Sequence, residues 1–177
     1  VRALRQIISA FPCILAVIGE GRWEEKYKEL CRRLRIEGYV RFLGKKTQLA
    51  PFYKAADLVA IPSRYESFCL VLVEAMACGA PVLASNVASI PELLSYGKFG
   101  YLADPENESD WAEKIKRILR EPEDAKLRAL RAVNYVKRRF SKQRMAYQVI
   151  KLYREVLEDE NRSSRAENPF PRTICIE

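Results

Sequence analysis

The stretch Glu66-Ser67-Phe68-Cys69-Leu70-Val71-Leu72-Val73-Glu74-Ala75-Met76-Ala77-Cys78-Gly79 decides the fold of this 177-residue chain. It follows the apolar run 57–62, which reads as a short buried strand of a parallel sheet. Glu66 closes the loop after that strand. Residues 68–78 read as a helix that is apolar on all sides, so we expect it to be buried. A carboxylate such as Glu74 is costly on a buried helix unless a protein group or a ligand meets it, and the context favours a ligand.

A polar loop joins this strand to the helix. Ser67 is the expected N-cap of the helix. The unpaired donors of the first turn would then be the backbone N–H groups of Phe68, Cys69 and Leu70. Together with the helix dipole, these donors suit a phosphate or diphosphate. Ligands of open α/β sheets bind at this edge, beyond the carboxyl ends of the strands.

Strands and helices alternate along most of the chain. The apolar patterns predict strands at 13–18, 39–43, 58–61, 80–84 and 99–102, and helices at 1–11, 22–36, 47–56, 68–78 and 89–95. This order predicts a Rossmann-like three-layer α/β/α domain with a parallel sheet covered on both faces. Further C-terminal helices are expected at 109–120, from 122 onward, and from 141 to about 158. Gly38 and Gly79 are expected to end helices in the left-handed conformation.

Six sequence blocks accompany the two glutamates. In chain order they are Arg41–Gly44, Ala55–Asp57, Pro62–Ser63, Glu74–Val82, Ile90–Glu92 and Gly97–Leu102. With the spacing from Glu66 to Glu74, these blocks resemble retaining glycosyltransferases of the two-domain GT-B architecture (group 1, family 4 type), over roughly residues 1–157. The resemblance implies that the chain is the C-terminal, donor-binding half of such an enzyme. That enzyme would move a hexose from a nucleoside diphosphate (NDP) sugar to an acceptor hydroxyl.

The resemblance also implies roles for particular residues. Glu74 matches the glutamate that accepts hydrogen bonds from the ribose hydroxyls, a task that suits a carboxylate because it has two acceptor oxygens. Glu66 matches the catalytic residue beside the transferred sugar, where it holds a sugar hydroxyl and helps to stabilise positive charge at the anomeric carbon. Backbone N–H groups of Ser67–Leu70 would contact the diphosphate and the sugar. Neither glutamate acts as a simple nucleophile in this family, for which front-face displacement is the usual proposal.

Several alternatives stay open around this site. The family usually has Gly where Cys69 stands, so Cys69 can narrow the site or alter the sugar it accepts, and a reactive thiol is a further interpretation. The turn Gly19-Glu20-Gly21 either borders the donor or is a plain structural turn. Leu43-Gly44-Lys45 lies where the family cradles the base, and its lysine can reach the base. Glu92 belongs to a family motif, but a capping box that begins at Ser89 explains it fully.

Composition narrows the classes of function. The chain contains no histidine, which argues against a zinc site or a histidine-based triad, and no Asp-x-Asp pair that would hold a metal. We expect no cofactor beyond the co-substrate, GDP-mannose or a UDP-hexose. The five cysteines show no CxxC spacing and are expected to be reduced thiols of a cytoplasmic protein. No apolar run reaches the about 18 residues of a membrane span.

The net charge of +8 is local. Residues 111–144 contain 12 Lys and Arg against 4 Asp and Glu, whereas the remainder contains 19 of each. A solvated helical face is the plainer interpretation. The alternative is a patch that contacts anionic lipid at the inner face of the membrane, where a lipid-linked acceptor would reside. No basic-aromatic pattern supports nucleic acid as a partner.

Residues 1–160 are predicted to form the donor domain, truncated at its N-terminal edge. Residues 161–177 are predicted to be a polar tail that is disordered or docked elsewhere. Relative to the family, the half that binds an acceptor saccharide or lipid-linked acceptor is absent, so we expect the fragment alone to be inactive. The resemblance leaves the hexose open between a mannose and a glucose type. A nucleotide-sugar-binding regulatory or interaction module without turnover is the alternative function.

Overall fold

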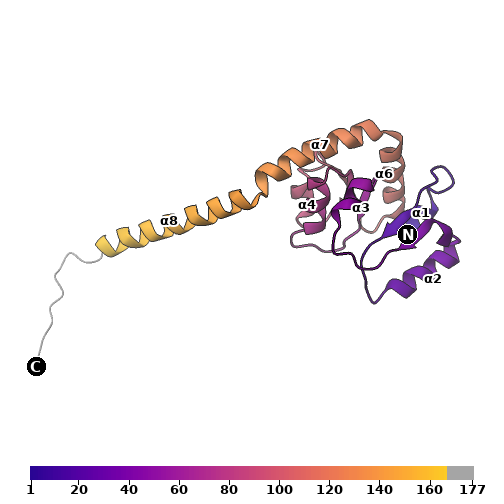
Figure 1. Cartoon of the computed structure of the whole chain (residues 1–177), viewed down its shortest axis with the longest axis horizontal. Coiled ribbons are helices and arrows are strands. Elements are labelled where there is room, and N and C mark those ends of the chain that lie inside the picture. Colours follow the sequence, from indigo (N-terminus) through magenta and orange to yellow (C-terminus); the bar gives the residue numbers. More distant parts are fainter. Residues whose placement is uncertain (167–177) are drawn as a thin grey trace, which may run out of the picture. The chain divides into compact units, whose positions relative to one another are not determined.

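The computed structural model of the chain describes residues 1–166, with side chains through residue 159. The chain divides into two compact units, Val1–Val136 and a second that starts at Lys137. In chain order the elements are α1 (Arg2–Arg5), β1 (Leu15–Val17), α2 (Glu24–Leu34), the 3-10 helix η1 (Glu37–Tyr39), β2 (Val40–Phe42), α3 (Ala50–Ala55), β3 (Val59–Ile61), α4 (Leu70–Ala77), β4 (Val82–Ser85), α5 (Ile90–Leu93), β5 (Tyr101–Ala103), α6 (Glu108–Arg120), α7 (Pro122–Arg139) and α8 (Lys142–Ala166) (Figure 1).

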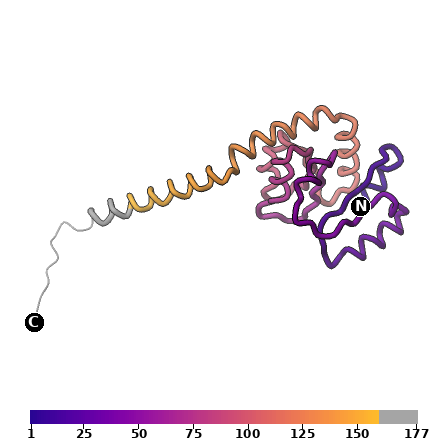
Figure 2. Tube along the Cα trace, in the orientation of Figure 1, coloured from indigo at the N-terminus to yellow at the C-terminus, as the bar shows by residue number. Residues whose placement is uncertain are grey.

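The strands pair in parallel, as the alternation with helices predicts, but in the described residues they form two sheets. β1 pairs with β2, placing Ala16 opposite Arg41. β4 lies between β3 and β5, and its Leu83 is opposite Ala60 on one side and Tyr101 on the other. Figure 2 allows the crossover through α2, from β1 to β2, to be followed along the trace. The predicted parallel α/β fold is confirmed, and the division into two hydrogen-bonded groups of strands is a detail that periodicity could not give, because it identifies strands without specifying which become neighbours.

Helices cover both faces of the β3–β4–β5 sheet. On one face, Leu83 joins a buried cluster with Trp111 and Ile118 of α6. On the other, Val82 and Leu94 at the end of α5 close around Gly100. All four residues of β4 are buried, as expected of a parallel strand at the centre of a three-layer domain. The predicted α/β/α layering is therefore confirmed for this sheet.

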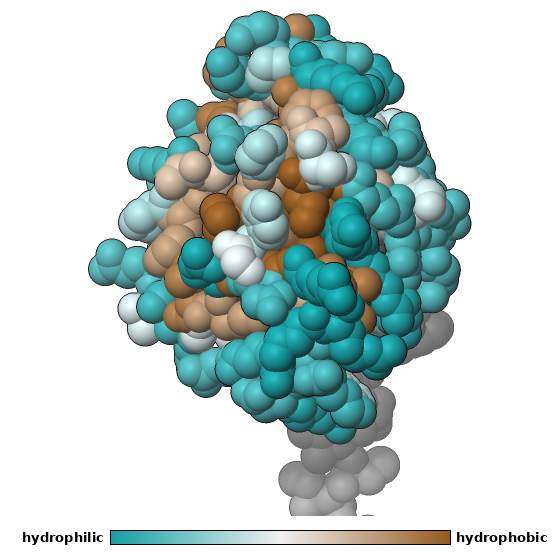
Figure 3. Space-filling model, turned by 90° about the vertical axis from the view of Figure 1, so that its right-hand side faces the viewer, coloured by the Kyte–Doolittle hydropathy of each residue, from teal (hydrophilic) through white to brown (hydrophobic). Residues whose placement is uncertain are grey.

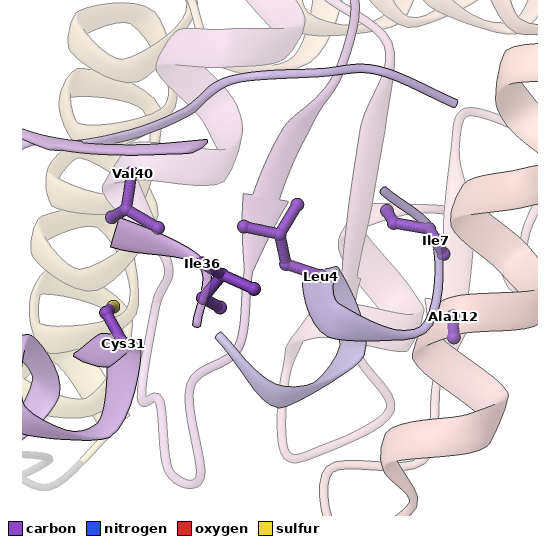
Figure 4. Packing of buried hydrophobic residues seen from close by; sticks show 6 residues of the cluster. All are labelled: Leu4, Ile7, Cys31, Ile36, Val40 and Ala112. Atoms are coloured by element: carbon purple, nitrogen blue, oxygen red, sulfur yellow. The ribbon is translucent and has the colours of Figure 1, made fainter. Parts of the chain in front are cut away.

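The β1–β2 sheet is less completely covered. Val40 packs in a cluster with Leu4, Ile7, Cys31, Ile36 and Ala112, which come from α1, α2, α6 and the segments beside them (Figure 4). Ala16 of β1 is nevertheless exposed, and the preceding Ile14 retains 59% of its exposure. Figure 3 shows a face of the molecule on which hydrophobic residues gather in the centre, surrounded by hydrophilic ones.

Left-handed residues end two of the helices. Gly79 has φ +76 after α4, as predicted. After α2, the left-handed residue is Arg35, with φ 56; its backbone N–H donates to the Arg32 carbonyl, and the N–H of the following Ile36 donates to the Cys31 carbonyl. The prediction for Gly38 is wrong, since Gly38 lies within η1. Helix α2 ends one residue before Arg35, so an arginine takes the conformation that glycine adopts more readily.

The remaining helices differ from their predicted bounds. α1 spans only Arg2–Arg5 of the predicted 1–11. α6 begins one residue earlier than expected, because the Asn107 side chain caps it by accepting the backbone N–H groups of Ser109 and Asp110. α8 continues to Ala166, so residues 161–166 are helical where a polar tail was predicted. Residues 167–177 lie outside the described residues.

Candidate functional site

The N-cap of helix α4 lies two residues later than predicted. The N-cap is Cys69 instead of Ser67, and Val73 donates the first helical hydrogen bond to the Cys69 carbonyl. Ser67 and Phe68 therefore belong to the loop after β3. Of the three predicted first-turn donors, only the N–H of Leu70 lies in the helix, and those of Val71 and Leu72 follow it. The backbone N–H groups that could bind an anion are therefore those of Leu70, Val71 and Leu72, two residues later than predicted.

α4 is not buried on all sides, and this corrects the expectation from its composition. Leu72, Ala75 and Met76 are buried, with the helical spacing of a face that packs on the sheet. Leu70 keeps 64% and Val71 45% of their exposure, and Glu74 follows them on the exposed side. Apart from Glu74, both faces are apolar in sequence, so periodicity could not distinguish them. Glu74 thus lies within reach of a ligand from solvent.

Glu74 is held by a tyrosine that the sequence did not indicate. The hydroxyl of Tyr53, on α3, donates a hydrogen bond of 3.1 Å to Glu74 Oε2. Burial raises the pKa of Tyr53 to about 12, and the Glu74 carboxylate contributes to this rise. Tyr53 therefore keeps its proton and acts as a donor. The sequence left open whether a protein group or a ligand meets the Glu74 carboxylate. In the structure a protein group, the Tyr53 hydroxyl, meets one of its two oxygens.

Glu66 is fixed by its own loop. The Ser63 hydroxyl donates a 2.9 Å hydrogen bond to Glu66 Oε1. Cys69 lies beside the same carboxylate, which contributes to its raised pKa. Arg64, which lies between Ser63 and Glu66 in sequence, points away from Glu66 and forms an exposed ion pair with Glu106, with 3.3 Å between Arg64 Nε and Glu106 Oε1. The loop thus aims Glu66 and Arg64 in different directions.

The Cys69 side chain points into the protein, with 1% of its surface exposed. Burial raises the pKa of this thiol, and the Glu66 carboxylate adds to the effect, whereas the N–H of Leu72 lowers it. A buried thiol with a raised pKa is poorly nucleophilic, so the reactive-cysteine alternative is disfavoured. The backbone φ of Cys69 is −78, which any residue can adopt. The described cysteines, residues 13, 31, 69 and 78, are free thiols, as predicted, and Cys175 lies outside the described residues.

The loops after β1 and β2 lie side by side. The N–H of Gly19 donates to the Gly44 carbonyl at 3.0 Å, and Leu43 donates to Val17 at 2.9 Å. Glu20 Oε1 accepts the Lys45 N–H at 3.4 Å. Gly44 has φ +63, a conformation that favours glycine. The structure therefore brings together Gly19, Leu43, Gly44 and Lys45, with Gly21 two residues beyond Gly19 in the same loop, and their role toward a donor remains a prediction.

The capping box at Ser89 is only partly formed. Ser89 is the N-cap of α5 and Glu92 lies in its first turn, but the Ser89 side chain makes no cap hydrogen bond. Its hydroxyl is buried without a partner in the described structure. The capping box therefore does not explain Glu92 in the way the sequence suggested, and Glu92 is exposed.

The basic segment 111–144 is partly neutralised along its own helices. Within the described residues, the ion pairs spaced three or four apart are Asp110–Lys114, Glu113–Lys116, Arg117–Glu121, Glu123–Lys126 and Asp124–Arg128. This favours the solvated helical face for that part of the segment. No helix in the described part of the chain is long and apolar enough to cross a membrane. In the same residues, no cluster of three His, Cys, Asp or Glu side chains forms a metal site.

Two kinds of comparison identify relatives of this chain. Residues 1–139 match the family described as glycosyl transferases group 1. N-acetyl-alpha-D-glucosaminyl L-malate synthase of Bacillus anthracis is 32% identical over 160 residues, which are 90% of this chain and 42% of that protein. D-inositol 3-phosphate glycosyltransferase of Corynebacterium glutamicum is 34% identical over 162 residues, 90% and 37% respectively.

A solved structure agrees with these relatives. Anabaena HepE in complex with UDP has a TM-score of 0.79 and 29% identity, covering 86% of this chain and 43% of that one. The same protein in complex with UDP-glucose has a TM-score of 0.77 over the same shares. The chain spans less than half the length of these relatives. Its sequence match and its fold together show that it belongs to the group 1 family of glycosyl transferases, with a fold like that of the GT-B enzymes.

Proposed function

We propose that this chain is the donor-binding half of a retaining glycosyltransferase, which moves a hexose from an NDP-sugar to an acceptor hydroxyl. The observation that carries the proposal is the placement of Glu74 on the exposed side of α4 with Glu66 in the loop before that helix. Glu74 would accept the ribose hydroxyls. Glu66 would hold a hydroxyl of the transferred sugar and stabilise positive charge at its anomeric carbon. The group at residues 19–21 and 43–45 would border the base.

The surroundings of Glu74 support a ligand at this place. Leu70 and Val71 expose large apolar side chains next to the carboxylate. Exposed apolar groups beside a convergent polar group are typical of a binding surface. The N-terminus of the eight-residue α4 supplies N–H donors to a diphosphate. No cofactor is invoked beyond the NDP-sugar, since neutralisation of the diphosphate by helix and backbone donors needs no metal.

The comparisons favour uridine over guanosine in the donor. HepE has been solved in complex with UDP and with UDP-glucose. The two relatives are named as an N-acetyl-alpha-D-glucosaminyl L-malate synthase and a D-inositol 3-phosphate glycosyltransferase. A UDP-hexose of the glucose type is therefore the donor we propose, and none of these names supports GDP-mannose. The acceptor would bind to the part of the relatives that this chain does not span. Contact with anionic lipid through the basic segment remains a prediction.

The alternative of a binding module without turnover loses one of its supports. Cys69 suggested a narrowed donor site, but its side chain is buried and turned away from solvent. The Cys69 substitution is therefore compatible with an active enzyme.

Calorimetric titration with UDP, GDP and ADP, repeated on Glu74→Ala, tests the proposal. Loss of hydrogen bonds to a charged group should weaken UDP binding by about 1.5–3 kcal/mol. Glu113→Ala, which removes an exposed glutamate on α6, is the matched control and should leave the affinity unchanged. Glu66→Gln should weaken UDP-glucose without weakening UDP. Equal UDP affinity in folded wild-type and Glu74→Ala protein would refute the ribose role of Glu74.

A further inference from the structure

We propose that Tyr53 is a positioning residue for the donor site: its hydroxyl fixes the Glu74 carboxylate in the orientation that receives the ribose hydroxyls. This inference rests on the proposed function, in which Glu74 binds the ribose. Tyr53 would not contact the substrate itself and would act only through the Glu74 carboxylate.

The donor of this hydrogen bond is buried and its acceptor is exposed. Tyr53 retains 7% of its exposure, and its helix α3 packs against α4. Glu74, by contrast, stands on the exposed side of α4. An exposed glutamate loses considerable rotamer freedom when a ligand orders it. The 3.1 Å hydrogen bond to Oε2 restricts that freedom before any ligand arrives.

The hydrogen bond also leaves capacity for a ligand. A carboxylate accepts about four hydrogen bonds, two at each oxygen. Tyr53 uses one of these positions, on Oε2, and so leaves the carboxylate with further acceptor capacity. Two adjacent hydroxyl donors, as in a ribose 2′,3′-diol, can therefore be accepted without displacing the tyrosine. Because burial raises the pKa of Tyr53 to about 12, the direction of this hydrogen bond does not change at neutral pH.

The chain offers a matched control for this contact. Tyr101 of β5 donates a 2.8 Å hydrogen bond to Asp124 Oδ2 of α7, and it too retains 7% of its exposure. Its pKa is also raised to about 12 by burial. It lies outside the candidate donor site. Tyr101→Phe thus removes an equivalent buried tyrosine–carboxylate hydrogen bond at a place where no nucleotide is expected.

The first measurement is independent of any ligand. With tyrosine labelled at Cζ, NMR titration follows the Tyr53 signal, assigned by its loss in Tyr53→Phe. In Glu74→Gln the pKa of Tyr53 should fall, because the neighbouring charge is removed, while the pKa of Tyr101 stays unchanged. An unchanged Tyr53 pKa would show that the contact is absent and would overturn the inference.

The second measurement compares UDP with 2′,3′-dideoxy-UDP by calorimetry. Tyr53→Phe should weaken UDP by about threefold to tenfold, the range for one hydrogen bond, and leave the dideoxy nucleotide unchanged. It should cause no further loss in a Glu74→Gln background, and Tyr101→Phe should affect neither nucleotide.

Equal weakening of both nucleotides by Tyr53→Phe would indicate a merely structural role and would overturn the inference. Normal UDP affinity of Tyr53→Phe, together with weakened UDP affinity of Glu74→Gln, would also overturn the inference, but it would leave the proposed function intact. Failure of the wild-type protein to discriminate UDP from its dideoxy form would instead refute the ribose role of Glu74, and the positioning role with it.

Discussion

Replacement of Gly100 by alanine should destabilise the domain through a specific steric conflict. A Cβ atom at this position would lie 2.5 Å from Val82 Cγ2 and 3.0 Å from both Leu94 Cδ2 and the Val82 carbonyl oxygen. Comfortable contacts between carbon atoms are about 3.5–4.0 Å, so the first falls short by about 1 Å. Gly100 directly precedes β5 and faces the layer formed by α5, so the conflict lies inside the three-layer core.

The neighbours of Gly100 cannot move away easily. Val82 is 1% exposed and β-branched, which restricts its χ1, and its carbonyl belongs to the central strand β4. Overpacking of this kind costs about 1–3 kcal/mol. Alanine also lowers the entropy of the unfolded chain, which returns about 0.4–1 kcal/mol. We therefore expect Gly100→Ala to lower the free energy of unfolding by about 1–2 kcal/mol.

Urea denaturation followed by circular dichroism measures this effect, provided that the m-value is unchanged. Gly38→Ala is the control, because a Cβ at Gly38 meets no atom within 4 Å and its φ is outside the left-handed region. Val82→Ala should rescue part of the loss in the Gly100→Ala background, since it removes the methyl group at 2.5 Å. Equal stability of Gly100→Ala and Gly38→Ala would refute the steric argument.

Two further predictions concern backbone conformation and pH. Arg35 and Gly79 both have positive φ, so Arg35→Gly should stabilise the protein by about 0.5–1 kcal/mol and Gly79→Ala should destabilise it by about 1 kcal/mol. Steric conflict adds nothing at Gly79, because a Cβ there would make only an ordinary 3.5 Å contact. Changes of the same sign in urea denaturation would contradict this. Tyr53 and Tyr101, each with its pKa raised from 10 to about 12, should make stability fall as the pH rises from 10 to 12. The unfolded state loses these protons first, so each tyrosine contributes stability, on the order of 1–3 kcal/mol, that is fully present below pH 10 and is lost as the pH rises toward 12. Tyr101→Phe should flatten the pH dependence, and an unchanged slope would exclude its contribution.

The positions of the strands and of most helices were predictable because local patterns determine them. β3 is an uninterrupted apolar run, and α4 is a longer apolar run bounded by Gly79. The division into two sheets was not predictable from these patterns, since strand neighbours are chosen by contacts between distant segments. The N-cap at Cys69 was missed for a related reason: Ser67 has the better capping side chain, but the loop that anchors Glu66 extends two residues further.

The candidate site was predictable in part. The spacing from Glu66 to Glu74 placed one carboxylate in a loop and the other on the following helix, and the structure agrees. The partner of Glu74 could not be read from the sequence, because Tyr53 lies 21 residues earlier on a different helix. The exposure of Glu74 was also missed, since the apolar residues on both sides of α4 suggested complete burial. Only the packing of α4 on the sheet distinguishes its two faces.

The two glutamates are held by different parts of the fold, and this separates their expected roles. Glu66 is oriented by Ser63 and lies against Cys69, both within three residues of it, so its position is a property of the loop after β3. Glu74 is oriented by Tyr53, so its position depends on the packing of α3 against α4. Changes in the loop should therefore act mainly on the sugar, and changes between α3 and α4 mainly on the nucleotide. If the proposed function holds, substitutions in the loop would change the choice of sugar while the contact between Glu74 and the ribose is preserved.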